Sequence, residues 1–261
     1  TGLSAARSLP VWRKPWRGPA PTDRTEIAIF ADTFNRYFEP ENLAAAHRVL
    51  SATGQAVADA TPAGARPLCS GRTYLAAGMI DQARAEMRRT MQAFQALPKD
   101  IPIVGLEPSC ILTFRDEAPR LLEDWEDSLT PRIMMFEEFI ADQPLDLKPI
   151  APRALLHGHC HQKAENVMGP VEEALRKIPN MNVETIDSSC CGMAGAFGYQ
   201  AETIDVSKAM GEISLLPAVR QAAPDDLIVA DGTSCRHQIG DGTGREALHV
   251  ARVLEMALAT G

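Results

Sequence analysis

Four cysteines in the second half of the chain each stand shortly after an apolar run. They are Cys160, Cys190, Cys191 and Cys235. Thiolates are soft ligands that suit iron–sulfur clusters and zinc, and four of them make a complete first coordination shell for either. The residue types therefore predict a metal or cluster site, provided that the loops carrying these side chains meet in space.

The spacing of these cysteines distinguishes the two chemistries. Structural zinc sites usually take their ligands from two short C-x2-4-C turns, whereas here 29 residues separate Cys160 from Cys190 and 43 separate Cys191 from Cys235. Adjacent sulfurs diverge unless the backbone bends, so Cys190 and Cys191 suit two iron atoms of a cluster better than one tetrahedral ion. Gly192 would let backbone N–H groups approach the sulfurs, and such hydrogen bonds tune a cluster.

The elements that must position these cysteines alternate as strand, loop and helix. Residues 154–156, 183–186 and 227–230 are each typical of a buried strand, and each leads to one cysteine group. The carboxyl ends of parallel strands lie along one sheet edge, where open α/β sheets bind ligands. The alternation predicts an α/β fold of two tandem, pseudo-duplicated Rossmann-like units with mainly parallel sheets and right-handed crossovers.

The same pattern extends over the rest of the chain. Further strands are expected at residues 26–30, 55–58 and 101–106. Helices are expected at residues 40–50, 74–97 with a break at Gly78, 111–123, 131–141, 170–178, 201–214 and 245–258. Each half of the chain should therefore build one sheet covered by helices.

An internal repeat is visible in the letters. Residues 101–110 match residues 226–235, Cys69-Ser-Gly71 matches Cys190-Cys-Gly192, and a third match pairs residues 30–33 with 157–160. The offsets are all close to 125 residues. We therefore expect a duplicated unit, with a degenerate first repeat at residues 25–150 and a second repeat, which keeps more of the thiols, at residues 151–261.

Residues 1–24 form a separate segment. They hold five basic residues against one acidic residue, together with four prolines and two tryptophans. Proline at this density disfavours helix and favours extended structure. One interpretation is a linker or arm whose tryptophans pack on the body of the protein or on a preceding domain. The other is a docking segment for an acidic partner or a membrane surface.

Composition and charge exclude several classes of protein. A formal net charge of −8 argues against nucleic-acid binding, which needs a concentrated basic face. No apolar run approaches the roughly 20 residues of a membrane span, and the start lacks a signal-peptide pattern, so a cytoplasmic location is expected. Six cysteines without such a signal favour metal-binding or redox roles over disulfides. The chain begins at Thr1 rather than at methionine, which agrees with a piece of a longer polypeptide.

The cysteine pattern resembles a known family. A cysteine, a later Cys-Cys-Gly and a final cysteine after a strand are similar to the cysteine-rich CCG domain. That domain is known from heterodisulfide reductase and from the iron–sulfur subunits of glycolate oxidase and anaerobic glycerol-3-phosphate dehydrogenase. The nearest likeness is to the carboxyl-terminal region of FAD-linked D-lactate or D-2-hydroxyglutarate dehydrogenase-like oxidases. Residues 157–164, 190–195 and 232–239 carry this likeness, which covers about residues 25–258.

The resemblance implies a cofactor for the second repeat. Family members with complete motifs bind an unusual non-cubane cluster in each copy, held by a pattern that ends in C-x-x-C. Here Gly232 and Glu107 stand where the first cysteine of that motif would be, and Thr33 and Ser70 replace two further cysteines of the first copy. We therefore expect one iron–sulfur cluster, of the 4Fe–4S type, in the second repeat and none in the first. Zinc is the alternative metal.

Other residues near the thiols have two interpretations each. Cys69 and Cys110 are either residual ligands or buried inert thiols, and the second is favoured. For the histidines, hydrogen bonding around the cluster is favoured, with one of them replacing a missing cysteine as the alternative. Lys163 and Arg236 are expected to compensate the charge of an anionic cluster, and Met193 is expected to pack. The histidines in question are His157, His159, His161 and His237.

Three functions follow. The first is an electron-transfer part of an FAD-linked 2-hydroxyacid oxidase or dehydrogenase, whose partners would be flavin-binding and ferredoxin-like domains or subunits and an acceptor such as quinone. FAD would lie on a separate domain or subunit, because this chain has no Gly-rich dinucleotide fingerprint. Such a protein could be peripheral to the inner membrane. The second is heterodisulfide-reductase-like thiol chemistry, and the third is a zinc-bound or metal-free docking scaffold.

Overall fold

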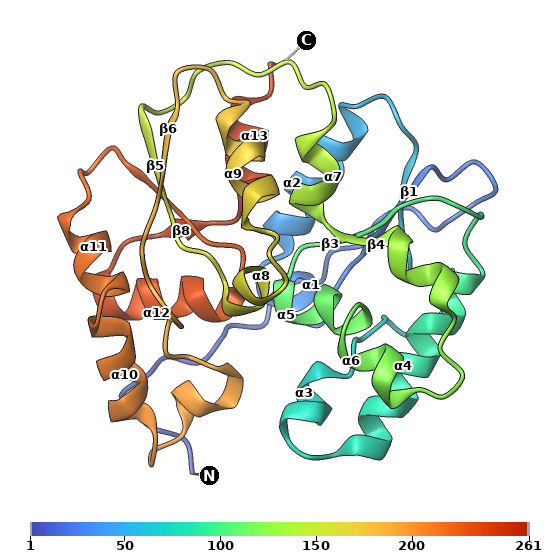
Figure 1. The fold of residues 1–261 in the computed structure, drawn as a ribbon, viewed down its shortest axis with the longest axis horizontal. Helices are drawn as coiled ribbons and strands as arrows, with labels where there is room; N and C mark the ends of the chain where they lie inside the picture. The colour runs from blue at the N-terminus through green and yellow to red at the C-terminus, as the bar shows by residue number, and fades with distance from the viewer. Residues whose placement is uncertain (1, 260–261) are drawn as a thin grey trace. The chain divides into compact units, whose positions relative to one another are not determined.

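The computed structural model describes residues 2–259. Thr1, where the predicted arm begins, and residues 260–261, where the predicted second repeat ends, lie outside that range. The chain divides into two compact units (Figure 1). The first unit is Trp12–Leu145, and the second joins residues 2–11 to residues 146–259.

The first unit is built on a four-stranded parallel sheet in the order β2-β1-β3-β4. Its strands are β1 (Ile27–Phe30), β2 (Val57–Asp59), β3 (Ile103–Gly105) and β4 (Ile133–Met135). Its helices are α1 (Thr33–Tyr37), α2 (Pro40–Ser51), α3 (Arg72–Ala76), α4 (Ile80–Gln95), α5 (Pro108–Ile111), η1 (Leu112–Phe114), α6 (Glu117–Leu121), η2 (Asp127–Arg132) and α7 (Phe136–Ala141). Phe30, Phe94 and Phe114 meet edge to face in its core, with ring centroids 5.3–5.8 Å apart.

The second unit repeats this plan with a parallel sheet in the order β6-β5-β7-β8. Its strands are β5 (Arg153–Leu156), β6 (Asn182–Thr185), β7 (Leu227–Val229) and β8 (Ala247–Leu248). Its helices are α8 (Cys160–Ala164), α9 (Met168–Arg176), η3 (Gly195–Tyr199), α10 (Ile204–Glu212), α11 (Leu215–Gln221), α12 (Thr233–Thr243) and α13 (Val250–Ala257). Figure 1 shows α9 beside α13.

The two identical strand orders confirm the predicted α/β class with mainly parallel sheets. Strand β1 consists of Ile27, Ala28, Ile29 and Phe30, all with no exposed surface. Such unbroken apolar strands are typical of a parallel sheet covered on both faces. β6 lies at a sheet edge, and most of its side chains are exposed, unlike those of β1.

Several expectations about elements were wrong, among them two strands and a helix. Residues 133–135 form β4 and residues 247–248 form β8, although both were expected inside helices. Helix α12 begins at Thr233, where only a loop was expected. Each missed strand is two or three residues long and runs directly into a helix, so the apolar pattern of the pair resembles that of one longer helix.

The amino-terminal segment is divided between the two units. Residues 12–24 lie on the first unit, where the Trp12 ring meets Phe38 edge to face at 4.7 Å and Trp16 lies 6.2 Å from His47. Residues 2–11 lie on the second unit, where Leu3 forms an antiparallel bridge with Gln200. Both tryptophans thus contact side chains of the first unit.

Over residues 2–259, no helix combines the length and apolar character needed to cross a membrane.

Candidate functional site

The four cysteines of the second unit lie at the carboxyl ends of three neighbouring strands. Cys160 is the first residue of α8, just after β5, and Cys235 lies in the first turn of α12, after β7. Cys190 and Cys191 lie in the loop after β6, which pairs with β5. Only the adjacent pair is carried by a loop, because the other two cysteines open helices. We call these four residues the thiol site.

The four sulfurs form one continuous chain of contacts. The thiol of Cys190 interacts with those of both Cys160 and Cys191, and the thiol of Cys191 also interacts with that of Cys235. The chain runs from an exposed end at Cys160 to a buried end, where Cys191 and Cys235 are 4% and 1% exposed. The adjacent pair therefore faces both of its companions, which is the arrangement that a shared cluster requires.

The contacts between the sulfurs lower the pKa of two thiols and raise the pKa of the other two. Hydrogen bonding to Cys160 lowers the pKa of Cys190, and hydrogen bonding to Cys191 lowers the pKa of Cys235, even though burial opposes both shifts. The same contacts raise the pKa of Cys160 and Cys191. These contacts favour the thiolate form at Cys190 and Cys235, and thiolate is the form that binds a metal.

Two histidines complete the inner end of the thiol site. His157 is 1% exposed, and one of its ring nitrogens lies within 4.8 Å of the sulfurs of Cys191 and Cys235, which lie equally close to each other. His159 is 6% exposed and caps α8, because its Nδ1 accepts a hydrogen bond from the backbone N–H of His161 at 3.1 Å. Both imidazoles also favour the thiolate of Cys235 electrostatically.

The position of Gly232 explains one departure from the full cysteine pattern. A Cβ atom added to Gly232 would fall 3.2 Å from Nε2 of His159, 3.3 Å from Sγ of Cys235, and in clash with Cδ2 of His159. The imidazole of His159 therefore fills the space that the first cysteine of a C-x-x-C motif would occupy. The absence of a side chain at Gly232 leaves room for the ring of His159.

Buried polar contacts fix the three strand ends. Gln162 is fully buried, accepts a hydrogen bond from the backbone N–H of His159 at 2.9 Å, and donates to Asp231 Oδ2 at 2.7 Å. Arg236 donates to the backbone oxygens of Ala230 at 2.8 Å and of Asp231 at 2.6 Å. The start of α8 is thereby tied to the loop that delivers Cys235.

The two cations beside the thiols bind backbone oxygens. Lys163 Nζ donates to the carbonyl oxygens of Ser188 and Ser189, directly before Cys190. Arg236, as described, holds the end of β7. Both side chains thus hold the loops of the thiol site in place. The sequence predicted only that they compensate the charge of a cluster.

The loop around Gly192 needs a residue without a side chain. The N–H of Gly192 donates to Sγ of Cys190 at 3.3 Å, and its φ of 93° is one that L-residues rarely adopt. A Cβ atom here would also clash with the backbone oxygen of Ser207 in α10. The expected approach of a backbone N–H to a sulfur is therefore present, and it depends on this glycine. Met193 beside it is fully buried and packs with Cys191 and Cys235.

The remaining histidines lie further out. His161 Nδ1 is 3.7 Å from Sγ of Cys160, and its ring stacks on that of His159. His237 is directed away from the sulfurs: its Nδ1 contacts the hydroxyl of Tyr199 at 3.1 Å and its Nε2 contacts Ser8 Oγ at 3.0 Å. His237 therefore joins the amino-terminal segment to η3, and the structure does not bring it into the thiol site.

The first unit contains a counterpart of the thiol site at the same strand ends. The N–H of Gly71 donates to Sγ of Cys69 at 3.4 Å, and Gly71 has a φ of 74°. Cys110 is 4% exposed, lies in α5 after β3, and is hydrogen-bonded to Ser70. Asp32 caps α1 after β1, as His159 caps α8. We call Asp32, Cys69, Ser70 and Cys110 the counterpart site.

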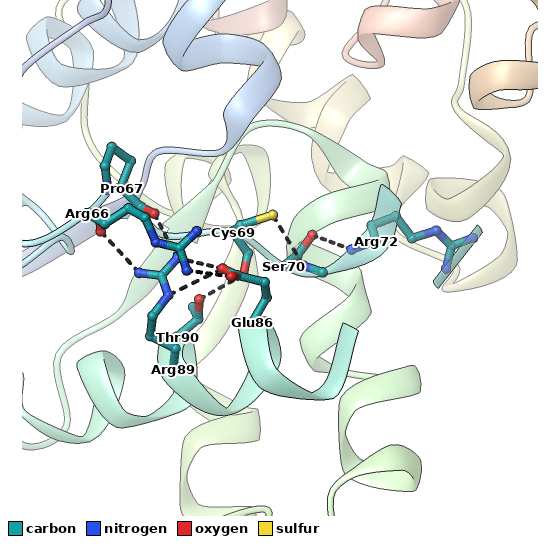
Figure 2. A network of polar contacts seen from close by, with 9 residues as sticks. Arg66, Pro67, Cys69, Ser70, Arg72, Glu86, Arg89 and Thr90 are labelled. Carbon is teal, nitrogen blue, oxygen red and sulfur yellow. Dashed lines mark hydrogen bonds and ion pairs between the residues drawn. The ribbon is translucent and has the colours of Figure 1, made fainter. Parts of the chain in front are cut away.

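Figure 2 shows how the loop of Cys69 is held. Thr90 Oγ1 donates to the backbone oxygen of Cys69 at 2.8 Å. Arg89 donates to the backbone oxygen of Pro67 at 2.8 Å and pairs with Glu86 at 2.7 Å, and Glu86 also pairs with Arg66. These contacts come from α4 and order the loop, and among the side chains that the figure labels Cys69 alone carries a thiol.

The two sites differ in the charges that surround their thiols. Burial raises the pKa of Cys110 well above its usual value, and the carboxylates of Asp32 and Glu107 raise it further. In the thiol site the neighbouring imidazoles of His157 and His159 act in the opposite direction on Cys235. The surroundings of Cys110 therefore favour the neutral thiol, whereas those of Cys235 favour the thiolate.

Comparison with known proteins agrees with the sequence resemblance. Residues 154–240 match the family model described as CCG, the cysteine-rich domain, which confirms that resemblance for the second unit. The matched segment begins in β5, ends in α12 and includes all four cysteines of the thiol site. No solved structure matches the chain significantly.

Three relatives show how much of the chain is shared. One of the subunits of anaerobic glycerol-3-phosphate dehydrogenase from Escherichia coli is 28% identical over 90% of this chain and 60% of its own length. D-2-hydroxyglutarate dehydrogenase from Pseudomonas putida is 28% identical over 90% of this chain and 23% of its own length. An uncharacterized iron–sulfur protein from Methanocaldococcus jannaschii is 23% identical over 74% of this chain and 37% of its own length. This chain therefore spans only part of the length of each of these relatives.

Several residues of the site gave no signal in the sequence. Ser188, Gln162 and Asp231 are ordinary polar residues, and their contacts depend on tertiary structure. His157 was one of four histidines near the cysteines, and the sequence does not distinguish it from His237. Its distinguishing feature, proximity to two buried sulfurs, required coordinates.

Proposed function

We propose that the second unit is an iron–sulfur electron-transfer domain, with Cys160, Cys190, Cys191 and Cys235 as cluster ligands. The observation that carries this proposal is the continuous chain of four sulfurs within a segment that matches the CCG domain. Two of the sulfurs already favour the thiolate form without metal. A bound cluster would accept and return single electrons there.

A 4Fe–4S cluster is proposed in preference to zinc. A single tetrahedral ion needs ligands that all reach one point, whereas the contacts between the sulfurs here pass in sequence from the exposed Cys160 through Cys190 and Cys191 to the buried Cys235. Ligands spread in this way suit a centre with several metal atoms. The name of the Methanocaldococcus jannaschii relative also includes iron–sulfur.

We propose that the whole protein oxidises a 2-hydroxy acid or a similar alcohol with an FAD on a separate domain or subunit. Two of the relatives are named as dehydrogenases or subunits of them, and both are longer than the part that this chain matches. Electrons would pass from flavin through a ferredoxin-like domain to this chain and then to an acceptor such as quinone. A quinone acceptor would place the protein in the cytoplasm, peripheral to the inner membrane.

The test is an anaerobic preparation in which iron, sulfide and zinc are quantified, followed by an EPR spectrum after reduction with dithionite. We expect about four irons and four sulfides per chain and a signal from a reduced cluster. Stoichiometric zinc without iron would contradict the proposal and would favour a docking scaffold. The Cys191→Ser variant serves as the matched control, and it should lose most of the iron.

A second measurement separates electron transfer from thiol chemistry. Because Cys160 is exposed and hydrogen-bonded to Cys190, a disulfide substrate could reach this end of the thiol site. We expect the EPR spectrum to stay unchanged when an organic disulfide is added to the reduced protein. A new or altered cluster signal would instead support heterodisulfide-reductase-like chemistry.

A further inference from the structure

We infer that His157 is a fifth ligand of the cluster and binds iron through Nε2, so that the site is formed by four thiolates and one imidazole. This inference rests on the proposed function, because it assigns a residue to the same cluster. It concerns the buried end of the thiol site, where the full family pattern would supply another cysteine at the position of Gly232. Burial, proximity and the tautomer of the ring support it.

The ring of His157 lies beside two buried sulfurs. His157 follows β5 directly and is 1% exposed. A ring nitrogen, Sγ of Cys191 and Sγ of Cys235 all lie within 4.8 Å of one another. Three potential ligand atoms from the ends of three adjacent strands thus surround one point inside the protein.

The two nitrogens of the ring differ in their contacts. His157 Nδ1 lies 2.8 Å from Ser188 Oγ, whereas Nε2 is buried and has no partner at ordinary hydrogen-bond distance within residues 2–259. The side chain of His157 also favours the nearby thiolate of Cys235. A buried polar atom without a partner costs free energy unless a group absent from the protein chain satisfies it. An iron atom beside Cys191 and Cys235 would satisfy Nε2 in this way.

Ser188 can accept a proton from the other nitrogen. The Ser188 hydroxyl donates to the backbone oxygen of Ile186 at 3.4 Å, so its oxygen is available to accept a hydrogen bond from Nδ1–H of His157. In the tautomer that makes this hydrogen bond, Nε2 keeps a lone pair for iron. A histidine that binds metal through one nitrogen commonly donates from the other in this manner.

The same reasoning assigns a different role to His159. Nδ1 of His159 accepts a hydrogen bond from the backbone N–H of His161, so the proton of the neutral ring is on Nε2. That N–H points toward the space beside Gly232 and Cys235. His159 therefore caps α8 through Nδ1 and favours the thiolates electrostatically, whereas His157 is the ligand.

The exchange of a thiolate for an imidazole changes the charge of the site. Each thiolate contributes a negative charge, whereas a neutral imidazole contributes none, and clusters with imidazole ligands have higher reduction potentials than those with thiolates alone. The His157 ligand would therefore make the cluster easier to reduce than one with five cysteines. Such a shift suits a centre that accepts electrons from a flavin.

The decisive experiment detects nitrogen bound to iron. The protein is produced with nitrogen-15 histidine, reconstituted anaerobically, and examined by electron–nuclear double resonance after reduction. We expect a nitrogen coupling of the size typical of a directly bound imidazole in the wild type and in His159→Gln, and its loss in His157→Ala. Iron K-edge X-ray absorption gives a second readout through imidazole scattering, whatever the spin state of the cluster.

The variant His157→Cys tests the effect of charge. It replaces the imidazole by a thiolate, so it should retain iron, lose the nitrogen coupling and lower the midpoint potential. Ser188→Ala removes the group that fixes the tautomer, and it should weaken the coupling while iron is kept. Circular dichroism of each variant shows whether the fold is intact.

The outcomes separate this inference from the proposed function. A wild-type protein without iron would overturn the proposed function itself. Iron at full stoichiometry without nitrogen coupling, or a coupling that survives in His157→Ala, would overturn the role of His157 alone. A coupling lost in His159→Gln but kept in His157→Ala would assign the ligand to His159 instead.

Discussion

One residue at the start of a helix differs in charge between the two units. Asp32 caps α1, and His159 caps α8 at the equivalent place after the first strand of each sheet. Oδ1 of Asp32 accepts from the backbone N–H groups of Phe34 and Asn35 at 2.9 and 3.0 Å. Both side chains therefore perform the same structural task. Because one is an acid and the other a base, they have opposite effects on the thiols near them.

Asp32 gives the first unit a pH-dependent stability. Burial, followed by the charge of Glu107, raises its pKa to about 6, although hydrogen bonds from Asn35 and Phe34 oppose the shift. The folded chain therefore binds the proton more tightly than the unfolded chain, and the contribution of Asp32 to stability falls as pH rises from about 4 to about 6. Relative to Asp32→Asn, the wild type should lose on the order of 3 kcal/mol over this interval.

Tryptophan fluorescence can measure this effect in the first unit alone. Trp12, Trp16 and Trp125 all lie within residues 12–145 and are the three tryptophans of the chain. Urea unfolding of the wild type and of Asp32→Asn would be followed at several pH values, with both proteins free of metal. Asn is also a good helix cap, so the variant keeps the start of α1. A difference that does not vary with pH would contradict the raised pKa.

At the scale of elements, the sequence predicted the strands that lead to cysteines, as well as β1, and missed the short strands β4 and β8. Strands β5, β6 and β7 stand where apolar runs predicted them, each within one residue at either end. β4 and β8 were absorbed into predicted helices, because two or three strand residues are too few to establish a period of two. Their pairing with β3 and β7 depends on tertiary contacts that the letters do not show.

The conformation of the loop between β6 and α10 depends more on Gly192 than on Gly195. Gly192 and Gly195 both have positive φ angles, of 93° and 62°. A Cβ atom at Gly192 would clash with Ser207, whereas one at Gly195 would meet no atom within 4 Å. Gly195→Ala should therefore cost roughly 1 to 2 kcal/mol of stability from backbone strain alone, and Gly192→Ala should cost clearly more.

The same pair of variants links this loop to the cluster. The N–H of Gly192 contacts Sγ of Cys190, so a displaced backbone also displaces a proposed ligand. We expect Gly192→Ala to retain less iron after anaerobic reconstitution, whereas Gly195→Ala retains nearly the wild-type amount. Thermal unfolding followed by circular dichroism gives the stability of each. Equal losses in the two variants would show that the contact with Ser207 is unimportant.

At the scale of the whole molecule, the sequence revealed the duplication more readily than the site. The repeated letters predicted two α/β units, and the two sheets have equivalent strand orders, β2-β1-β3-β4 and β6-β5-β7-β8. Both units even retain a glycine N–H that contacts a cysteine sulfur, at 3.4 and 3.3 Å. What distinguishes the units is the charge around these sulfurs, which arises partly from residues far apart in sequence, such as Asp32 and Cys110.

This difference in charge predicts which unit binds iron. A cluster ligand must lose its proton, and two carboxylates oppose that loss at Cys110, whereas the contacts of Cys235 favour it. The double variant Cys69→Ser with Cys110→Ser should therefore keep the full iron and sulfide content of the wild type. The matched double variant Cys191→Ser with Cys235→Ser should lose nearly all of it.

Both double variants replace two sulfurs by oxygens of similar size, so they differ mainly in the unit that they affect. Iron and sulfide analysis after anaerobic reconstitution gives the comparison directly, and tryptophan fluorescence verifies the fold of the first unit. A large loss of iron from the first double variant would mean that the counterpart site binds metal despite Asp32 and Glu107. In that case, the carboxylates near Cys110 would have to act as ligands themselves, and the charge difference between the units would not decide where iron binds.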